Sequence, residues 1–322
     1  MRRGGLILWM LAAPLPLAAQ NISLTSPIGC DLQDVCFIQQ YTDRDPTTGV
    51  QDFTCGALTY DGHKGTDFAL PDWSMIADNI PVLAAADGVV AGVRNDMPDI
   101  LQGQPGAPVI DGNDCGNGLV INHGDGWETQ YCHMKRGSLA VQPGQRVTQG
   151  ELLGNVGQSG RSEFAHLHLS VRHDGTVVDP FDADDSVTCG TAGDASLWSV
   201  SMPMRPGGLV SVGFSNAVPD FDTIRFGAAD TAPLATNAPA LVLWGYLFGG
   251  RDGDQIRIMI DGPDGPVFDD TQVLNRTQAQ LFRAGGKRTP GGGWSAGDYI
   301  GTVMMIRDGD VLETLTKTIA LD

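Results

Sequence analysis

The chain has 322 residues and a formal net charge of −18, from 38 acidic and 20 basic side chains. Its length favours two domains, and its charge argues against nucleic acid or an anionic membrane surface as a partner, because both would repel it. The 43 glycines and an aromatic content of only 7% are typical of many short strands joined by tight turns, so we expect a mainly β protein.

The first 19 residues have the pattern of a signal peptide. Two arginines follow the first methionine, an apolar run covers residues 6–13, and small residues end the segment at Ala18-Ala19. This run is shorter than the roughly 20 residues that a transmembrane helix needs, which disfavours the alternative of an uncleaved anchor, and no later segment approaches that length. We expect cleavage near Ala19, no integral membrane segment afterwards, and a periplasmic or extracellular location.

Six cysteines, all before residue 190, fit an oxidising compartment. None stands in a CxxC arrangement, which argues against a cysteine-based zinc site. Their even number permits all six to pair, but spacing alone does not choose the connectivity. We expect Cys30, Cys36 and Cys55 to staple the irregular segment of residues 20–60.

The remainder of the first half is expected to consist of short strands separated by glycine turns. Residues 81–93 form two apolar strands about the turn Asp87-Gly88, residues 119–122 and 128–133 form a hairpin around residues 124–126, and brief strands follow within 142–147 and 150–154. The hairpin would bring Cys115 near Cys132, so we predict a disulfide between them. The domain closes near residues 179–181.

The second half is predicted to be a separate β-sandwich of residues 206–322, reached through a linker of residues 186–205. Two segments, residues 261–265 and 308–310, have the composition of hairpin turns. About seven short strands in this length predict an immunoglobulin-like fold. This half has no histidine or cysteine, so we assign it a binding or packing role. Its predicted strands are residues 209–214, 223–226, 240–248, 255–260, 299–307 and 311–321.

The triplet His166-Leu167-His168 lies in a run, residues 165–171, that alternates in the manner of a β-strand. Residues two apart on a strand point to the same face, so the two histidines share one side while Leu167 can face a core. Two imidazoles on one face can both reach a metal and a group bound to it.

Two earlier segments supply further candidate ligands, His63 with Asp67 and, later, His133. A fully extended strand would separate His63 from Asp67 by roughly 13 Å, too far for one metal, so the chain must bend between them, and Gly65 allows the bend. Alone, an HxxxD pattern more often marks a solvated turn, and His133 alone is equally compatible with a hydrogen-bonded strand histidine.

Together these side chains predict a zinc hydrolase. Zinc in a hydrolase takes three protein ligands and keeps a fourth position for water. We favour His63, Asp67 and His168 as the ligands, because two neutral histidines and one carboxylate leave a net charge of about +1 that lowers the pKa of water toward 7.

The sequence resembles the lysostaphin-type, LytM-like zinc metallopeptidases, a family of peptidoglycan endopeptidases. The resemblance covers residues 55–182 and says nothing about the C-terminal half. The matching segments are HKGTDF from His63, PVLAAADGVV from Pro81, YCHM from Tyr131, GNVGQSG from Gly154 and HLHL from His166.

The resemblance implies an antiparallel β-sheet peptidase domain, residues 20–185 with its core at 55–182, and a site in a groove. It implies one zinc ion per chain, bound by His63, Asp67 and His168. His133 and His166 are implied to be catalytic residues that orient water, move protons and stabilise the oxyanion. The expected function is a secreted or periplasmic zinc metalloendopeptidase that hydrolyses peptide bonds of bacterial peptidoglycan.

The sequence also departs from the family pattern. Leu169-Ser170 stand where the family commonly has Phe-Glu, the stretch of residues 161–165 is longer than usual, and residues 71–80 and 95–114 have the character of insertions that rim the groove. Two alternatives stay open. One is a non-catalytic regulator of cell-wall amidases, although such members of the fold typically lack the metal ligands that are present here. The other is a zinc endopeptidase acting on Gly-rich extracellular proteins.

Overall fold

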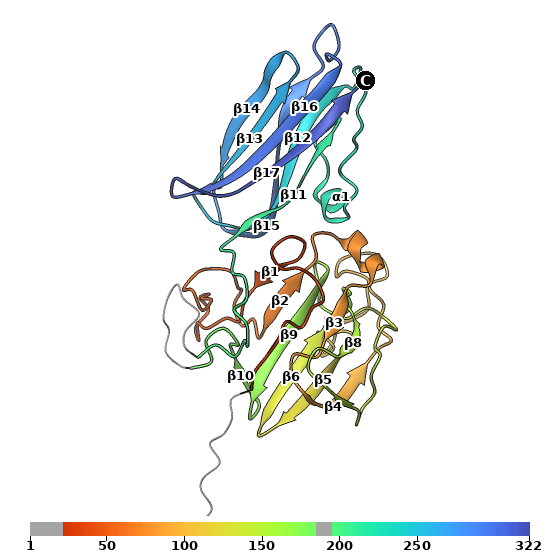
Figure 1. The fold of residues 1–322 in the computed structure, drawn as a ribbon, viewed down its shortest axis with the longest axis vertical. Helices are drawn as coiled ribbons and strands as arrows, with labels where there is room; N and C mark the ends of the chain where they lie inside the picture. The colour runs from red at the N-terminus through yellow and green to blue at the C-terminus, as the bar shows by residue number, and fades with distance from the viewer. Residues whose placement is uncertain (1–21, 185–194) are drawn as a thin grey trace, which may run out of the picture.

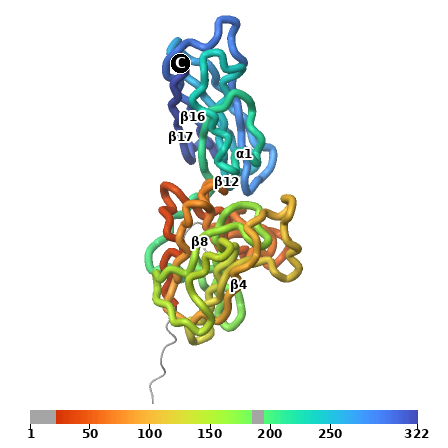
Figure 2. The backbone as a smooth tube through the Cα atoms, turned by 90° about the vertical axis from the view of Figure 1, so that its right-hand side faces the viewer, coloured from red at the N-terminus to blue at the C-terminus, as the bar shows by residue number. Residues whose placement is uncertain are grey.

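A computed structural model describes residues 22–184 and 195–322 of the chain. The expected signal peptide of residues 1–19, and residues 186–194 of the expected linker, lie outside the described residues. The described chain is mainly β, as predicted, and forms two β bodies stacked along the long axis of the molecule (Figures 1 and 2). Within these ranges no helix is both long enough and apolar enough to cross a membrane.

The first body is built on an antiparallel sheet of eight strands, in the order β1-β2-β9-β6-β5-β4-β7 with β10 paired to β9. β9 lies between β2 and β6, so segments from three distant parts of the chain become neighbours (Figure 1). The strands are β1 (Phe37–Gln40), β2 (Thr66–Ala69), β4 (Gly88–Arg94), β5 (Gly118–Gly124), β6 (Trp127–Cys132), β7 (Arg146–Val147), β9 (His166–His173) and β10 (Thr176–Val178).

The predicted hairpin is present, because β5 and β6 pair across the turn at Asp125-Gly126. The predicted disulfide between Cys115 and Cys132 is confirmed, and Cys30 bonds to Cys36. The two strands about Asp87-Gly88 also form, but they do not pair with each other. β3 (Pro81–Leu83) joins β8 (Leu152–Asn155) in a separate small sheet, whereas β4 joins the large one. A short 3-10 helix, η1 (Trp73–Asp78), follows β2.

The second body contains two sheets, β11-β12-β15 and β14-β13-β16-β17. The apolar side chains of both sheets enclose a core in which Leu243, Ile258 and Val303 are fully buried. The strands are β11 (Gly208–Ser215), β12 (Ala240–Gly250), β13 (Gln255–Gly262), β14 (Gly265–Val273), β15 (Gln278–Arg288), β16 (Gly297–Arg307) and β17 (Asp310–Leu321).

One strand predicted for this half is wrong, and two were missed. Residues 223–226 belong to a helical segment, α1 (Phe221–Arg225), in which Asp222 pairs with Arg225 one turn later and Ile224 is buried. Four residues are too few to distinguish a period of two from one of 3.6. β14 escaped notice because it is an edge strand without a buried residue, and β15 because two adjacent glycines, Gly285 and Gly286, interrupt the alternation.

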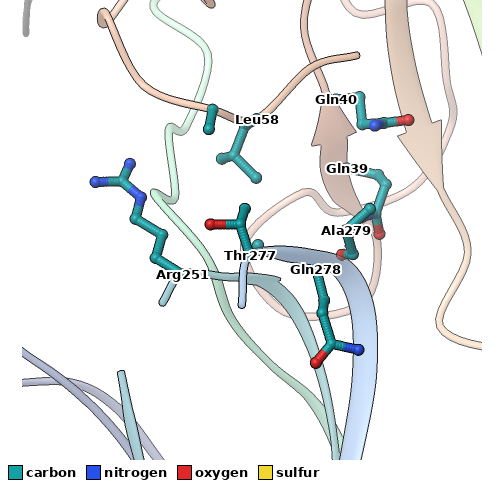
Figure 3. Close-up of a pocket in the computed structure, with 9 residues that line it drawn as sticks. Gln39, Gln40, Leu58, Arg251, Thr277, Gln278 and Ala279 are labelled. Atoms are coloured by element: carbon teal, nitrogen blue, oxygen red, sulfur yellow. Dashed lines mark hydrogen bonds between the residues drawn. The ribbon is translucent and has the colours of Figure 1, made fainter. Parts of the chain in front are cut away.

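The two bodies contact each other through side chains from both. Phe248, at the end of β12, is fully buried in the core of the first body, where its ring centroid lies 4.5 Å from that of Phe37. Gln39 on β1 donates from Nε2 to the carbonyl oxygen of Ala279 on β15 at 2.7 Å. Figure 3 shows this junction, with Gln39 and Gln40 opposite the segment Thr277–Ala279.

Asp179 gives the first body a pH-dependent stability. Burial raises the pKa of its carboxyl from 3.8 to about 7, although the backbone N–H of Phe181 donates to it at 3.0 Å. The folded chain therefore keeps a proton that an unfolded aspartate releases near about pH 4, so the contribution of Asp179 to stability falls as the pH rises from about 4 to about 7.

We predict that Asp179→Asn, which keeps the accepting oxygen and cannot ionise, is more stable than the wild type by a margin that grows with pH. Between about pH 5 and about pH 8 the difference in unfolding free energy should widen by roughly 2–3 kcal/mol. Denaturant unfolding of both proteins at the two pH values measures it. A difference that is the same at both would contradict the assignment.

Candidate metal centre and catalytic cleft

Strand pairing places the predicted ligands side by side. Asp67 on β2 lies directly opposite His168 on β9, and His63 reaches the same point from the turn that precedes β2. The bend predicted between His63 and Asp67 is present. A Cβ at Gly65 would lie 2.5 Å from the carbonyl oxygen of Leu169 and 2.7 Å from Nε2 of His168, so only glycine permits this close approach.

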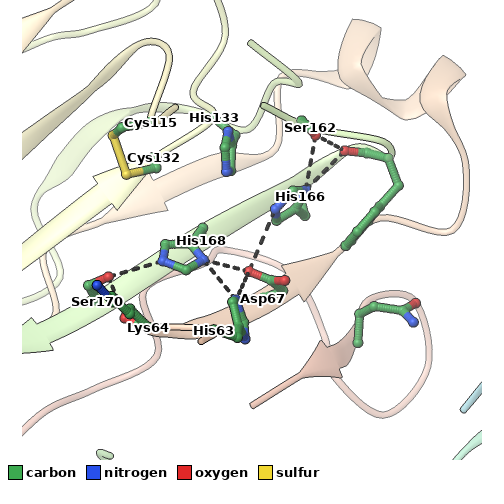
Figure 4. A network of polar contacts seen from close by, with 12 residues as sticks. His63, Lys64, Asp67, Cys115, Cys132, His133, Ser162, His166, His168 and Ser170 are labelled. Carbon is green, nitrogen blue, oxygen red and sulfur yellow. Dashed lines mark hydrogen bonds and ion pairs between the residues drawn. A yellow bond between two sulfur atoms is a disulfide. The ribbon is translucent and has the colours of Figure 1, made fainter. Parts of the chain in front are cut away.

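The three ligand atoms form a compact triangle. Oδ1 of Asp67 lies 2.8 Å from Nδ1 of His168 and 3.2 Å from Nε2 of His63, and the two nitrogens are 3.1 Å apart (Figure 4). Zinc bonds to nitrogen and oxygen of about 2.0–2.1 Å in a tetrahedron require ligand atoms about 3.3 Å apart. The triangle has nearly that size, so these residues fit one face of a zinc tetrahedron.

His133 and His166, the two other predicted residues, lie beside this triangle (Figure 4). Their ring centroids are 4.6 Å apart, and Nε2 of His166 is 3.6 Å from Oδ1 of Asp67. His133 follows β6 directly, and its backbone N–H donates to the carbonyl oxygen of Cys115 at 2.8 Å. The disulfide of Cys115 to Cys132 therefore ties down the segment that carries His133. The structure brings all five predicted side chains together.

Backbone carbonyl groups orient three of the four histidines. A carbonyl oxygen only accepts, so the Nδ1 that faces it carries the proton and Nε2 presents a lone pair to the site. The three bonds are those of His63 to Tyr41 at 2.7 Å, His133 to Ser159 at 2.7 Å and His166 to Phe164 at 2.9 Å.

His168 is oriented in the opposite sense, by Ser170. Nε2 of His168 lies 3.0 Å from Oγ of Ser170, and that hydroxyl donates to the carbonyl oxygen of Lys64 at 2.6 Å. The hydroxyl must therefore accept from His168, which leaves the lone pair of Nδ1 facing Asp67. Sequence reasoning noted Ser170 only as a departure from the family pattern. Its position two residues after His168, on the same face of the strand, was the signal that could have identified its role.

The ionisation of the site suits metal binding. Burial lowers the pKa of His133 well below its ordinary value and also lowers the pKa of His166. Burial alone would raise the pKa of Asp67, but the neighbouring histidines outweigh it and hold that pKa well below its usual range. Burial would likewise lower the pKa of His63, yet Asp67 outweighs it and raises that pKa. An ionised carboxylate beside imidazoles is the donor set that zinc requires.

The site opens into a cleft of about 540 Å³. From the first body, Asp67 and the three histidines at 133, 166 and 168 line it, together with Tyr60 and residues 161–164. The second body also contributes to the lining. Its lining residues there are Phe221 and Arg225 on α1, and Ala279 and Gln280 on β15.

Comparison with known proteins finds similarity to a family model in the first body. Residues 61–180 match the model of Peptidase family M23. The chain is 34% identical over 122 residues to the peptidoglycan DD-endopeptidase ShyA of Vibrio cholerae, covering 38% of this chain and 23% of that protein. It is 35% identical over 118 residues to the DD-carboxypeptidase/endopeptidase Mpg of Neisseria meningitidis, covering 37% of this chain and 22% of that protein.

A third relative is the cell division protein DipM of Caulobacter vibrioides, 36% identical over 99 residues, with 31% of this chain and 14% of that protein covered. The chain thus spans less than a quarter of the length of these relatives. Among solved structures, the catalytic domain of lysostaphin from Staphylococcus simulans is 20% identical, with a TM-score of 0.28, 44% of this chain and 85% of that chain covered.

We predict that Ser170→Ala weakens zinc binding by about 10- to 100-fold, because His168 loses the partner that fixes its orientation. Competition for zinc with a chelator of known affinity measures the change. Ser138→Ala is the matched control, since the Ser138 hydroxyl bonds to the carbonyl oxygen of Lys135 and not to a predicted ligand. Equal zinc affinity in wild type and Ser170→Ala would show that the hydroxyl has no such role.

Proposed function

Because residues 61–180 match the model of Peptidase family M23, we propose that the chain is a zinc-dependent endopeptidase that hydrolyses peptide bonds of bacterial peptidoglycan. The observation that carries this proposal is the triangle of ligand atoms from His63, Asp67 and His168, with two further histidines beside it. The relatives described as peptidoglycan DD-endopeptidases support the choice of substrate.

In the proposed mechanism, His63, Asp67 and His168 hold one zinc ion, which would act as a Lewis acid on the scissile carbonyl and would acidify water. His133 and His166 present their Nε2 atoms to the cleft as neutral imidazoles. One of them accepts a proton as water attacks the carbonyl carbon, and the resulting imidazolium stabilises the negative oxygen of the tetrahedral intermediate. The same proton then passes to the departing amide nitrogen as the C–N bond breaks.

The proposed location is the periplasm or the cell exterior, after cleavage of a signal peptide near Ala19. The disulfides Cys30–Cys36 and Cys115–Cys132 support it, because such bonds persist in oxidising compartments.

We further propose that the second body is an immunoglobulin-like sandwich. Its first, second and fifth strands form one sheet, and its fourth, third, sixth and seventh form the other. Two packed antiparallel sheets with this division of seven strands support an immunoglobulin-like sandwich, of the kind in which the fourth strand (β14) pairs with the third (β13).

Asp67→Ala tests the metal site. Wild-type protein should contain about one zinc per chain and should cleave purified peptidoglycan, and the variant should lose both, because two histidines alone leave the ion without a charged ligand. Elemental analysis and chromatography of released fragments are the measurements. Asp61→Ala, at an exposed aspartate nearby, is the control. Wild-type protein that takes up no zinc but activates a cell-wall amidase would instead favour the regulatory alternative.

His133→Ala and His166→Ala test the catalytic roles. Each variant should keep its zinc and should lose turnover by about 100-fold or more, since proton transfer and charge stabilisation are removed while the ligands remain. His173→Ala, at a partly exposed histidine on the far end of β9, should behave like the wild type. Unchanged turnover in both test variants would refute the mechanism.

A further inference from the structure

The second body forms one wall of the catalytic cleft. Phe221 and Arg225 from α1, with Gln280 from β15, line the same cleft as His133 and His166. The volume of about 540 Å³ lies within the range of about 300–1,000 Å³ that is usual for ligand sites. A substrate that occupies this cleft would therefore touch both bodies.

Contacts from two elements of the second body hold this wall in place. From β15, Gln280 donates from Nε2 to Oε1 of Gln39 on β1 at 3.3 Å. From α1, Arg225 donates to the carbonyl oxygen of Glu163 at 3.2 Å, and its guanidinium lies 4.8 Å from the ring centroid of Trp73. Gln39 and Glu163 both line the cleft, so the wall has a defined position relative to the histidines.

Gln40 is placed to bind a substrate next to the metal ligands. It pairs in register with Asp67 on the neighbouring strand, and cross-strand partners have side chains about 4.5–5.5 Å apart at Cβ. Gln40 is only 7% exposed, and its side-chain amide makes no hydrogen bond to another described residue. Neither amide atom of Gln40 is among the buried polar atoms that lack a partner, so the amide reaches the solvent of the cleft and is available to a group that enters it. Gln40 lines that cleft.

Gln280, from the second body, presents a similar amide to the same cleft. Its Nε2 is held by Gln39, while its Oε1 has no hydrogen-bond donor among the described residues. A side-chain amide offers both a donor and an acceptor, as does each peptide group of an extended chain. Phe221, which stacks on Phe282 with ring centroids 5.6 Å apart, adds an apolar surface to the same wall.

We propose that the substrate is an extended peptide held between the two bodies, with its backbone groups bound by the amides of Gln40 and Gln280 and one side chain packed on Phe221. This inference rests on the proposed endopeptidase function and adds that the C-terminal sandwich determines which peptides bind. A peptide with unpaired backbone N–H and C=O groups suits these amides, whereas a folded protein surface does not.

Gln40→Met and Gln280→Met test the proposal in the full-length, zinc-loaded protein, because methionine keeps the side-chain volume and removes the hydrogen bonds. The probes are cross-linked muropeptides released from purified peptidoglycan by a muramidase. Each variant should lose about five- to tenfold in kcat/KM, mainly through a higher KM, with zinc content unchanged. Thermal stability should also stay unchanged in Gln40→Met, whose amide has no hydrogen bond to a described residue, whereas Gln280→Met loses the bond to Gln39. Phe221→Ala should raise KM in the same way. Gln255→Met, at an exposed glutamine on β13 of the same body, is the matched control.

The outcomes separate the two proposals. Wild-type protein that binds zinc but cleaves no muropeptide overturns the proposed function. If the wild type cleaves muropeptides and both Gln40→Met and Gln280→Met keep kcat/KM within twofold of it, the proposed binding of the peptide by the two amides is overturned. A higher kcat/KM in Gln280→Met would show that the second body obstructs the cleft instead. If Gln40→Met does not fold, Gln280→Met decides the question, since Gln280 is only partly buried.

Discussion

The site depends on the pairing of β2 with β9, which sets Asp67 directly opposite His168. Side chains alternate along a strand, so a slip of one residue would turn both histidines of β9 into the core and Leu167 and Leu169 out of it. The complete burial of these two leucines resists that slip. The hydrophobic core therefore fixes the register that brings the ligand atoms together.

The orientation of the histidines comes mainly from the main chain. The carbonyl oxygens of Tyr41, Ser159 and Phe164 each accept a hydrogen bond from the Nδ1–H of one imidazole. The hydroxyl of Ser170 links His168 to the carbonyl oxygen of Lys64. Every residue has a backbone carbonyl, so most of the acceptors that orient these histidines are set by backbone geometry and not by residue identity. A pattern of residue types therefore says little about them.

The fold of the second half shows the same limit. Strands with a clear alternation or a continuous apolar run, such as β12 and β17, were recognised from sequence, because burial of one or both faces leaves that pattern. β14 was missed because it is an edge strand in which no residue is buried, and α1 because a segment of five residues is too short to show a helical period. A hydrophobic pattern arises from burial of one face of an element. An element that is short or little buried therefore cannot be identified from such a pattern.

The sequence by itself determined which side chains are candidates for binding a metal, that His166 and His168 share a face, and that the chain must bend at Gly65. Only the tertiary structure decided that Ser170 orients His168 and that Gln280 lines the same cleft as the histidines. The physical reason is distance along the chain. Gln39 and Gln280 are 241 residues apart, and no local pattern records a contact that depends on how the two bodies pack against each other.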